Sequence, residues 1–263
     1  MADQIHFDEA WTRRVEAIYS TPDMVAQRRS VLAGIAAQPG ERIADLGAGP
    51  GMLAAELARA VGPSGQVRGI DISQPMAKLA QRRCAGFPWV DLGMGDVTDL
   101  PYADDEFDAA VSTQVYEYVP DVAAALGELR RVLRPGGRAL ILDTDWDTLI
   151  WHVRDLARQR RILAAFEAHC AHPRLARQLP PLLRATGFQM EWQGVHTIFN
   201  PALSENTYSH GIIEWDYRLY RRLCRRTAGA PAGRSGGVAR RPARTGGDGR
   251  LLLQHQPLSV SGA

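Results

Sequence analysis

A glycine-rich turn joins a short apolar segment to an amphipathic one, and it limits the choice of fold more than any other part of this sequence. Residues 42–46 (RIADL) have the pattern of a buried strand, and residues 51–61 (GMLAAELARAV) have the period of a helix. Between them, DLGAGPG places glycines at 47, 49 and 51. Glycine permits a sharp turn and brings backbone N–H groups and a helix N-terminus close to a ligand. A tight turn needs glycine in any case, so this motif alone is weak evidence for a ligand site.

Predicted strands and helices alternate on both sides of this turn. We predict helices at 7–19, 23–37, 51–61, 75–84 and 121–133, and strands at 42–46, 67–72, 89–96, 107–113 and 138–144. Pro135, Gly136 and Gly137 mark the end of the last of these helices. The alternation predicts an α/β fold with a doubly wound, mostly parallel, Rossmann-like sheet covered by helices on both faces.

The rest of the chain divides into an insertion, a further strand and a basic tail. We expect one domain at 1–215, with a core at 28–145, a mostly helical insertion at 147–187 and a sixth strand at 189–200. Residues 216–263 contain ten arginines and two aspartates, a net charge of +8; since the whole chain carries +2, residues 1–215 carry −6. A basic partner surface, if present, is therefore confined to the tail.

Acidic residues end two of the predicted strands. Asp71 stands where a carboxylate accepts hydrogen bonds from a ribose diol, and Asp96 ends the next strand, where a carboxylate can accept from the adenine amino group. The candidates for an apolar slot around the ring are Ile72, Met76 and Val97. Asp45, directly before the glycine turn, would repel a pyrophosphate but could hold an ammonium or sulfonium group. The sequence therefore predicts a cationic adenosine ligand at the carboxyl edge of the sheet.

Four consecutive segments resemble the ordered motifs of class I S-adenosylmethionine-dependent methyltransferases. These are ERIADLGAGPGMLAAELA, GIDISQPM, GDVTDLPYADDEFDAAVSTQVYEYV and LRRVLRPGGRALILD, and the match to the family covers about residues 28–145. They are most similar to the small-molecule group that includes ubiquinone and menaquinone C-methyltransferases. The resemblance implies S-adenosylmethionine as the cofactor and a small-molecule acceptor. It implies cofactor-binding roles for Asp45, Gly47, Ala48, Gly49, Gly51, Asp71, Ile72, Met76, Asp96, Val97 and Thr113.

The family fold also implies a final antiparallel strand beside the fifth strand, and the sequence offers no strong candidate for it. Residues 251–260 (LLLQHQPLSV) are apolar, but Pro257 is poorly tolerated in a central strand. Read one nucleotide later, codons compatible with the tail give more strand-like text, such as YFFSINRYLF from residue 250 onward. We therefore expect residues 216–263 to be irregular or out of frame, and we hypothesise a frameshift near 214–216. A natural disordered tail is the alternative.

Methyl transfer from a sulfonium mainly requires alignment and a desolvated pocket, so no catalytic signature can be demanded of the sequence. Candidate substrate contacts lie on elements expected to cover the carboxyl edge: Tyr19, Tyr116, Tyr118, Asp145, Trp146 and His152. Asp145 or His152 could act as a base, whereas Trp146 could simply pack the insertion. His169, Cys170 and His172 are too few ligands for a metal, and we predict none.

Four other functions compete with small-molecule methylation. An NAD-dependent oxidoreductase is disfavoured by Asp45 and by GxGxG in place of GxGxxG. An RNA or DNA methyltransferase is disfavoured by the acidic body and by STQVYEY after the fourth strand, so we predict no nucleic-acid partner. Arsenite methylation would need paired cysteines, whereas Cys84, Cys170 and Cys224 are widely separated. An inactive cofactor-binding remnant is the fourth.

The predicted location is cytoplasmic. The odd number of cysteines does not suggest a disulfide framework, and the N-terminal segment lacks the pattern of a secretory signal. No segment approaches the apolar length of a membrane span.

Overall fold

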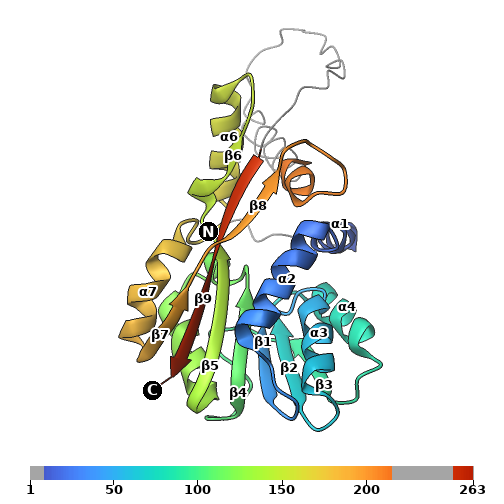
Figure 1. Cartoon of the computed structure of the whole chain (residues 1–263), viewed down its shortest axis with the longest axis vertical. Coiled ribbons are helices and arrows are strands. Elements are labelled where there is room, and N and C mark those ends of the chain that lie inside the picture. Colours follow the sequence, from blue (N-terminus) through green and yellow to red (C-terminus); the bar gives the residue numbers. More distant parts are fainter. Residues whose placement is uncertain (1–8, 215–250, 263) are drawn as a thin grey trace, which may run out of the picture.

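The computed structural model describes residues 9–214 and 251–262, and these form a nine-stranded sheet with helices on both faces (Figure 1). The strands are β1 (Arg42–Leu46), β2 (Gln66–Asp71), β3 (Val90–Met94), β4 (Phe107–Thr113), β5 (Leu133–Thr144), β6 (Ile150–Trp151), β7 (Phe188–Gln193), β8 (His196–Asn200) and β9 (Leu251–Gly262). The α-helices are α1 (Glu9–Tyr19), α2 (Pro22–Ile35), α3 (Met52–Val61), α4 (Gln74–Cys84), α5 (Val122–Val132), α6 (Leu156–Glu167) and α7 (Leu175–Ala185). Short 3₁₀ helices are η1 (Tyr116–Tyr118) and η2 (Trp146–Thr148).

The order of the strands confirms the predicted doubly wound sheet. It runs β3-β2-β1-β4-β5-β9-β6, and β7 and β8 also pair with β9. Strands β1 to β5 are parallel, and their register aligns their carboxyl ends: Leu46 pairs with both Ile70 and Ser112, and Thr113 pairs with Leu142. All residues of β1 except the first are buried, as expected for a parallel strand covered on both faces.

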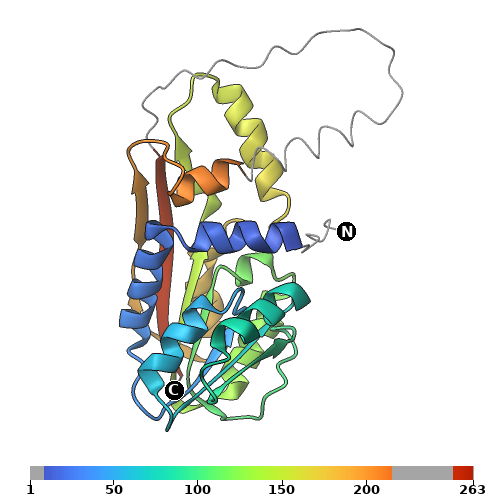
Figure 2. The same ribbon diagram turned by 90° about the vertical axis from the view of Figure 1, so that its right-hand side faces the viewer.

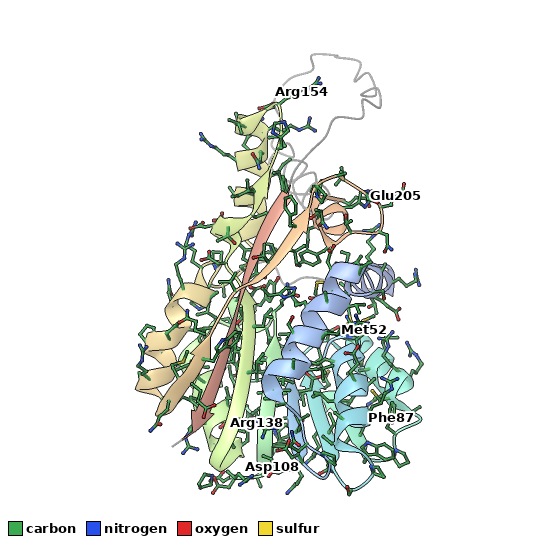
Figure 3. All side chains as sticks on the ribbon, in the orientation of Figure 1. Met52, Phe87, Asp108, Arg138, Arg154 and Glu205 are labelled. Carbon is green, nitrogen blue, oxygen red and sulfur yellow. The ribbon has the colours of Figure 1, made fainter. Side chains whose placement is uncertain are left out.

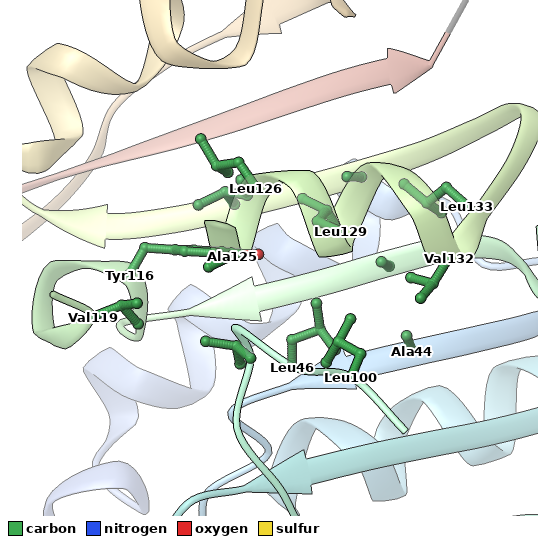
Figure 4. Close-up of a cluster of buried hydrophobic side chains, with 14 of the residues drawn as sticks. Ala44, Leu46, Leu100, Tyr116, Val119, Ala125, Leu126, Leu129, Val132 and Leu133 are labelled. Carbon is green, nitrogen blue, oxygen red and sulfur yellow. The ribbon is translucent and has the colours of Figure 1, made fainter. Parts of the chain in front are cut away.

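Apolar side chains fill the space on each face of this sheet. One cluster joins α5 and α7 to the strands and includes Leu126, Leu129 and Leu179; Figure 4 shows the part around α5. The cluster on the other face includes Val31 of α2 and Leu57 of α3. Fully burying one such leucine stabilises the fold by about 1.5–3 kcal/mol. The two clusters hold the strands rigidly and so fix the position of the loops at their ends.

The helix predicted at 121–133 and the strand predicted at 138–144 have different bounds in the structure. Helix α5 begins at Val122 and is capped by Asp121, whose carboxylate accepts a hydrogen bond from the backbone N–H of Ala124 at 2.9 Å. It ends at Val132, and β5 begins directly at Leu133. The Pro-Gly-Gly segment at 135–137 therefore lies inside β5, where the register with β4 shifts.

The predicted single strand at 189–200 is wrong as one element. The chain forms β7 up to Gln193 and β8 from His196, with Gly194 and Val195 between them. A side chain at Gly194 would meet the exposed ring of Trp192 at 2.2 Å, so this ring would have to move to make room for it. Both strands pair antiparallel with β9.

The prediction that 216–263 is irregular is wrong for residues 251–262, which form β9 antiparallel to β5; the rest of the tail lies outside the described residues. Pro257 lies opposite Leu142 of β5. On its other side, pairing with β7 ends at Leu258 and pairing with β8 begins at His255. Pro257 therefore lies at the gap between the pairing of β9 with β7 and its pairing with β8. A missing N–H on the side of β7 and β8 costs no hydrogen bond between strands.

The insertion after β5 extends the molecule beyond the carboxyl edge of the sheet. Strand β6 and α6 form this extension, whereas α7 packs against the sheet beside β7. Figure 2 shows α1 lying across the molecule between the sheet and this extension. A third apolar cluster, which includes Met24, Trp146 and Ile212, joins α2 to this part of the chain. Among the described residues, no helix is both long enough and apolar enough to cross a membrane.

Candidate active site

The glycine turn after β1 has left-handed backbone at three positions. The φ angles are 78° at Gly47, 52° at Gly49 and 75° at Gly51. The N–H groups of Gly47 and Ala48 donate to the carbonyl of Ile70 at 2.9 and 2.8 Å, which ties the turn to β2. A side chain would collide with Val115 at position 47 and with Ala80 at position 51, whereas position 49 faces open space. Gly49 is therefore the part of the turn that a ligand can approach.

Asp71, at the end of β2, connects that strand to the turn. One carboxylate oxygen accepts from the backbone N–H of Gly49 at 2.9 Å, and the other accepts from that of Ser73 at 2.8 Å. Burial raises the pKa of Asp71, and these two hydrogen bonds oppose that rise. Each oxygen retains a lone pair that could accept from a ligand hydroxyl.

Asp45 lies in β1, behind the glycine turn, and is 1% exposed. Its Oδ2 atom has no hydrogen-bond partner among the described residues. Burial, and then the charge of Asp71, raise the pKa of Asp45 to about 7, although the backbone N–H of Ala54 acts in the opposite direction. A buried carboxylate without a cation is costly, and a cationic ligand would relieve that cost.

The predicted ring slot is only partly assembled. Asp96 is exposed, and its Oδ1 atom accepts from the backbone N–H and the hydroxyl of Thr98 at 2.9 and 2.8 Å. Ile72 is 64% exposed, as is Met94, which the sequence reasoning missed. Met76 and Val97 are instead buried in the protein interior. Ile72 and Met94 are therefore the better candidates for contact with a flat ring.

The loop after β4 is clamped to the end of β5 by reciprocal hydrogen bonds. The backbone N–H of Val115 donates to Asp143 at 2.9 Å, and that of Thr144 donates to Glu117 at 2.8 Å. Both acidic side chains are fully buried. Burial raises the pKa of each, and the charge of Asp143 raises that of Glu117 further. This pair of acids lies at the same sheet edge as Asp45 and Asp71.

Tyrosines from three parts of the chain meet at this edge. The pKa of Tyr19, at the end of α1, is raised by burial and then by three nearby carboxylates, those of Glu117, Asp71 and Asp143. The pKa of Tyr118 is raised by burial and then by Glu117, Cys170, Tyr19 and Tyr208. Tyr19 and Tyr118 therefore lie beside the buried acids, and their contact with a substrate stays a prediction. Acids and aromatic rings together can hold a cationic or aromatic group.

Residues 44–141, which carry the turn and these strand ends, match the family model described as a methyltransferase domain. This segment is a methyltransferase domain. A solved structure of geranyl diphosphate C-methyltransferase from Streptomyces coelicolor A3(2) has the same fold, with a TM-score of 0.60 at 15% identity; the match covers 91% of this chain and 76% of that one. That structure contains S-adenosyl-L-homocysteine. The fold predicted from the resemblance is thus confirmed.

Two curated relatives match at higher identity over part of their length. The uncharacterized 37.1 kDa protein in transposon TN4556 of Streptomyces fradiae is 45% identical over 142 residues, which cover 54% of this chain and 41% of that protein. The 2-phytyl-1,4-naphtoquinone methyltransferase of Synechococcus elongatus is 44% identical over 119 residues, which cover 44% of this chain and 51% of that protein. The matches thus span about half the length of these relatives, or less.

Four predicted substrate contacts of the methyltransferase domain and its insertion lie in different surroundings, and their role stays a prediction. Asp145 is buried and forms a bidentate ion pair with Arg177, with both N–O distances at 2.6 Å, so its carboxylate is already engaged. Trp146 packs in the third apolar cluster, and His152 is exposed. Tyr116 is fully buried, and its hydroxyl has no hydrogen-bond partner among the described residues. Thr113 ends β4, at the edge where the cofactor was predicted.

The sequence reasoning missed four residues at this edge: Gln114, Glu117, Asp143 and Tyr208. Glu117 and Asp143 stand within the motifs quoted above, but neither was assigned a site role from the sequence. Their signal was an acid in an otherwise apolar run, which in a buried segment requires a partner or a function. Tyr208 had no local signal, because it reaches Gln114 across 94 residues.

The structure also bears on metal and thiol chemistry. No group of three or more His, Cys, Asp or Glu side chains within 9–214 and 251–262 is placed to hold a metal ion. His172 instead contacts the carbonyl of Pro120 through Nε2 at 3.1 Å. Cys84 and Cys170 belong to different apolar clusters, and Cys224 lies outside the described residues. Arsenite methylation therefore gains no support from the two described thiols.

Proposed function

We propose that this chain binds S-adenosylmethionine and transfers its methyl group to a small-molecule acceptor. The observation that carries the proposal is Asp45, a buried carboxylate with one unpaired oxygen directly behind an open glycine turn. A sulfonium ligand supplies the positive charge that this site lacks, whereas a pyrophosphate would add negative charge.

The described residues suit each part of such a cofactor. Asp71 would hold the ribose diol and the open backbone at Gly49 would lie against the methionine portion, while Ile72 and Asp96 would contact the adenine. S-adenosylmethionine supplies an activated methyl group, and the chain supplies alignment and exclusion of water. Asp45 acts at a distance by stabilising positive charge near the turn.

The acceptor is proposed to be small and to contain a ring. A quinone-type methyltransferase matches at 44% identity, and Tyr19 and Tyr118 place aromatic surface at the edge of the sheet. Aromatic side chains favour flat apolar ligands. The cytoplasmic location and the lack of a nucleic-acid partner stay predictions, as do the remaining roles assigned to the site residues.

Calorimetric titration of the full chain tests the cofactor. We expect S-adenosylmethionine and S-adenosylhomocysteine to bind and NAD to bind at least about a hundredfold more weakly, a difference of about 2.7 kcal/mol. Binding of NAD alone would overturn the proposal. Transfer of a labelled methyl group to a component of cell extract is the second readout, and a chain that binds the cofactor but never transfers would be an inactive remnant.

A further inference from the structure

Gln114, the residue after β4, is held in a strained conformation. It is a non-glycine residue with φ of 57°, and it is buried. Its backbone N–H donates to the carbonyl of Leu142 at 2.6 Å. Its side-chain Nε2 donates to the hydroxyl of Tyr208 at 3.0 Å and to that of Thr144 at 3.2 Å. Strain of this kind persists only where the surroundings fix it, and it is concentrated at functional sites.

The other polar atom of this carboxamide is unsatisfied. Gln114 Oε1 is buried and has no hydrogen-bond partner among the described residues. A buried acceptor left unpaired costs about 1–3 kcal/mol, so it calls for an explanation. The two hydrogen bonds of Nε2 fix the orientation of the carboxamide and leave Oε1 available to a ligand.

Glu117 presents a second acceptor in the same place. Its Oε2 atom accepts from the backbone N–H of Thr144, the residue whose hydroxyl accepts from Gln114. The two side chains thus converge on one residue at the end of β5. Tyr208 contacts Gln114, and Tyr118 lies beside Glu117, so aromatic rings flank both acceptors.

The charges around these side chains have one sign. The groups that raise the pKa of Tyr19 electrostatically are Glu117, Asp71 and Asp143, and those acting on Tyr118 are Glu117, Cys170 and two further tyrosines. No lysine or arginine is among these groups. In these surroundings a hydrogen-bond donor on a ligand would satisfy the unpaired oxygen of Gln114.

We infer that Gln114 and Glu117 form a binding subsite that accepts hydrogen bonds from a hydroxyl or amino group on an aromatic methyl acceptor. This inference rests on the proposed function, since the subsite lies beside the predicted cofactor position. A carbonyl group of a quinone does not fit it, because it would bring a third acceptor to the two already present. An O–H or N–H group would satisfy the unpaired oxygen of Gln114, and Glu117 offers a second acceptor beside it.

Matched naphthalene probes test the subsite on the full chain loaded with S-adenosylhomocysteine. The probes are 1-naphthol, 1-naphthylamine and 1-methoxynaphthalene, which share a shape but differ in hydrogen-bond donation. We expect the donor-bearing probes to bind at least about tenfold more tightly than the methoxy compound. The tighter of the two shows whether the natural acceptor carries a hydroxyl or an amine. Equal affinities, or no binding of any probe, overturn the inference.

Variants separate this result from a failure of the cofactor site. Gln114→Met keeps the length of the side chain, and Glu117→Gln removes the charge; we expect each to abolish most of the tenfold preference. Their affinity for S-adenosylhomocysteine should stay within about twofold of that of the original chain. Gln178→Met and Glu205→Gln are the matched controls at exposed positions, and Figure 3 shows Glu205 in the segment that follows β8. Retained preference in both subsite variants overturns the inference, whereas no binding of S-adenosylhomocysteine by the original chain overturns the proposed function instead.

Discussion

Asp45 shows how one buried acid sets the pH dependence of stability. Its folded pKa of about 7 lies above its ordinary value, since burial and then Asp71 disfavour the charge. Between about pH 4 and 7 the folded chain binds more protons than the unfolded chain, so the free energy of unfolding falls as the pH rises. We expect Asp45→Asn to raise that free energy on the order of 2 kcal/mol at about pH 8 and to change it little near pH 4. Urea unfolding at both pH values measures this, and an equal effect at the two would contradict it.

Two glycines of the turn predict contrasting effects of the same substitution. At Gly51, where φ is 75°, an added Cβ would lie 2.7 Å from the Cα atom of Ala80, so backbone would have to move. At Gly49 the φ is 52° and no atom lies within 4 Å. We expect Gly51→Ala to lower the free energy of unfolding by about 2–4 kcal/mol and Gly49→Ala by about 1 kcal/mol.

Ligand affinity should show the opposite order for the folded variants. Gly49→Ala places a methyl group in the space assigned to the methionine portion, so we expect at least about a tenfold loss of S-adenosylmethionine affinity. Denaturant curves with calorimetry on the same samples give both quantities. If Gly49→Ala binds like the original chain, the cofactor does not approach the turn there.

The pairing of β9 with its neighbouring strands predicts where proline is tolerated in that strand. Pro257 stands in the interruption between β7 and β8, whereas Ser259 pairs with Trp192 on one side and with Leu140 on the other. We expect Pro257→Ser to change the free energy of unfolding by less than about 1 kcal/mol and Ser259→Pro to lower it by about 3 kcal/mol or more. Thermal unfolding of both variants decides it, and equal losses would place β9 in a different register.

The strands and the glycine turn could be predicted because their signals are local. The 42–46 segment is apolar and continuous, and the glycines follow it directly, so β1 and the turn were read correctly. Pro257 misled the prediction because the break between β7 and β8 is a property of the paired strands and not of 251–260. Asp145 misled it for a related reason, since Arg177 reaches it across 32 residues. Long-range partners decided whether a promising side chain was available.

At the scale of the whole molecule, the buried acids couple cofactor binding to pH. Asp45 faces Asp71, and Asp143 faces Glu117, all at one edge. Asp108 forms an ion pair with Arg134, and Arg138 forms one with Glu41. Figure 3 shows Asp108 and Arg138 at the opposite end of the sheet. A sulfonium favours the ionised form of Asp45, so binding should strengthen as the pH rises through about 7.

Titration at two pH values tests this coupling. We expect S-adenosylmethionine to bind about tenfold more tightly near pH 8 than near pH 5.5, and Asp45→Asn to remove most of the difference. S-adenosylhomocysteine, which lacks the sulfonium charge, is the control and should show a smaller dependence. The same pH dependence in the Asn variant would assign it to the other acids.

The central position of β9 also has a consequence for synthesis on the ribosome. Strands β5, β7 and β8 are complete by Asn200, but their common partner begins at Leu251, fifty residues later. At about 5–20 residues per second, the nascent chain would present these unpaired strand edges for roughly 3–10 s. Unpaired edges readily join those of neighbouring chains. The yield of this protein should therefore depend on how quickly translation delivers its last strand.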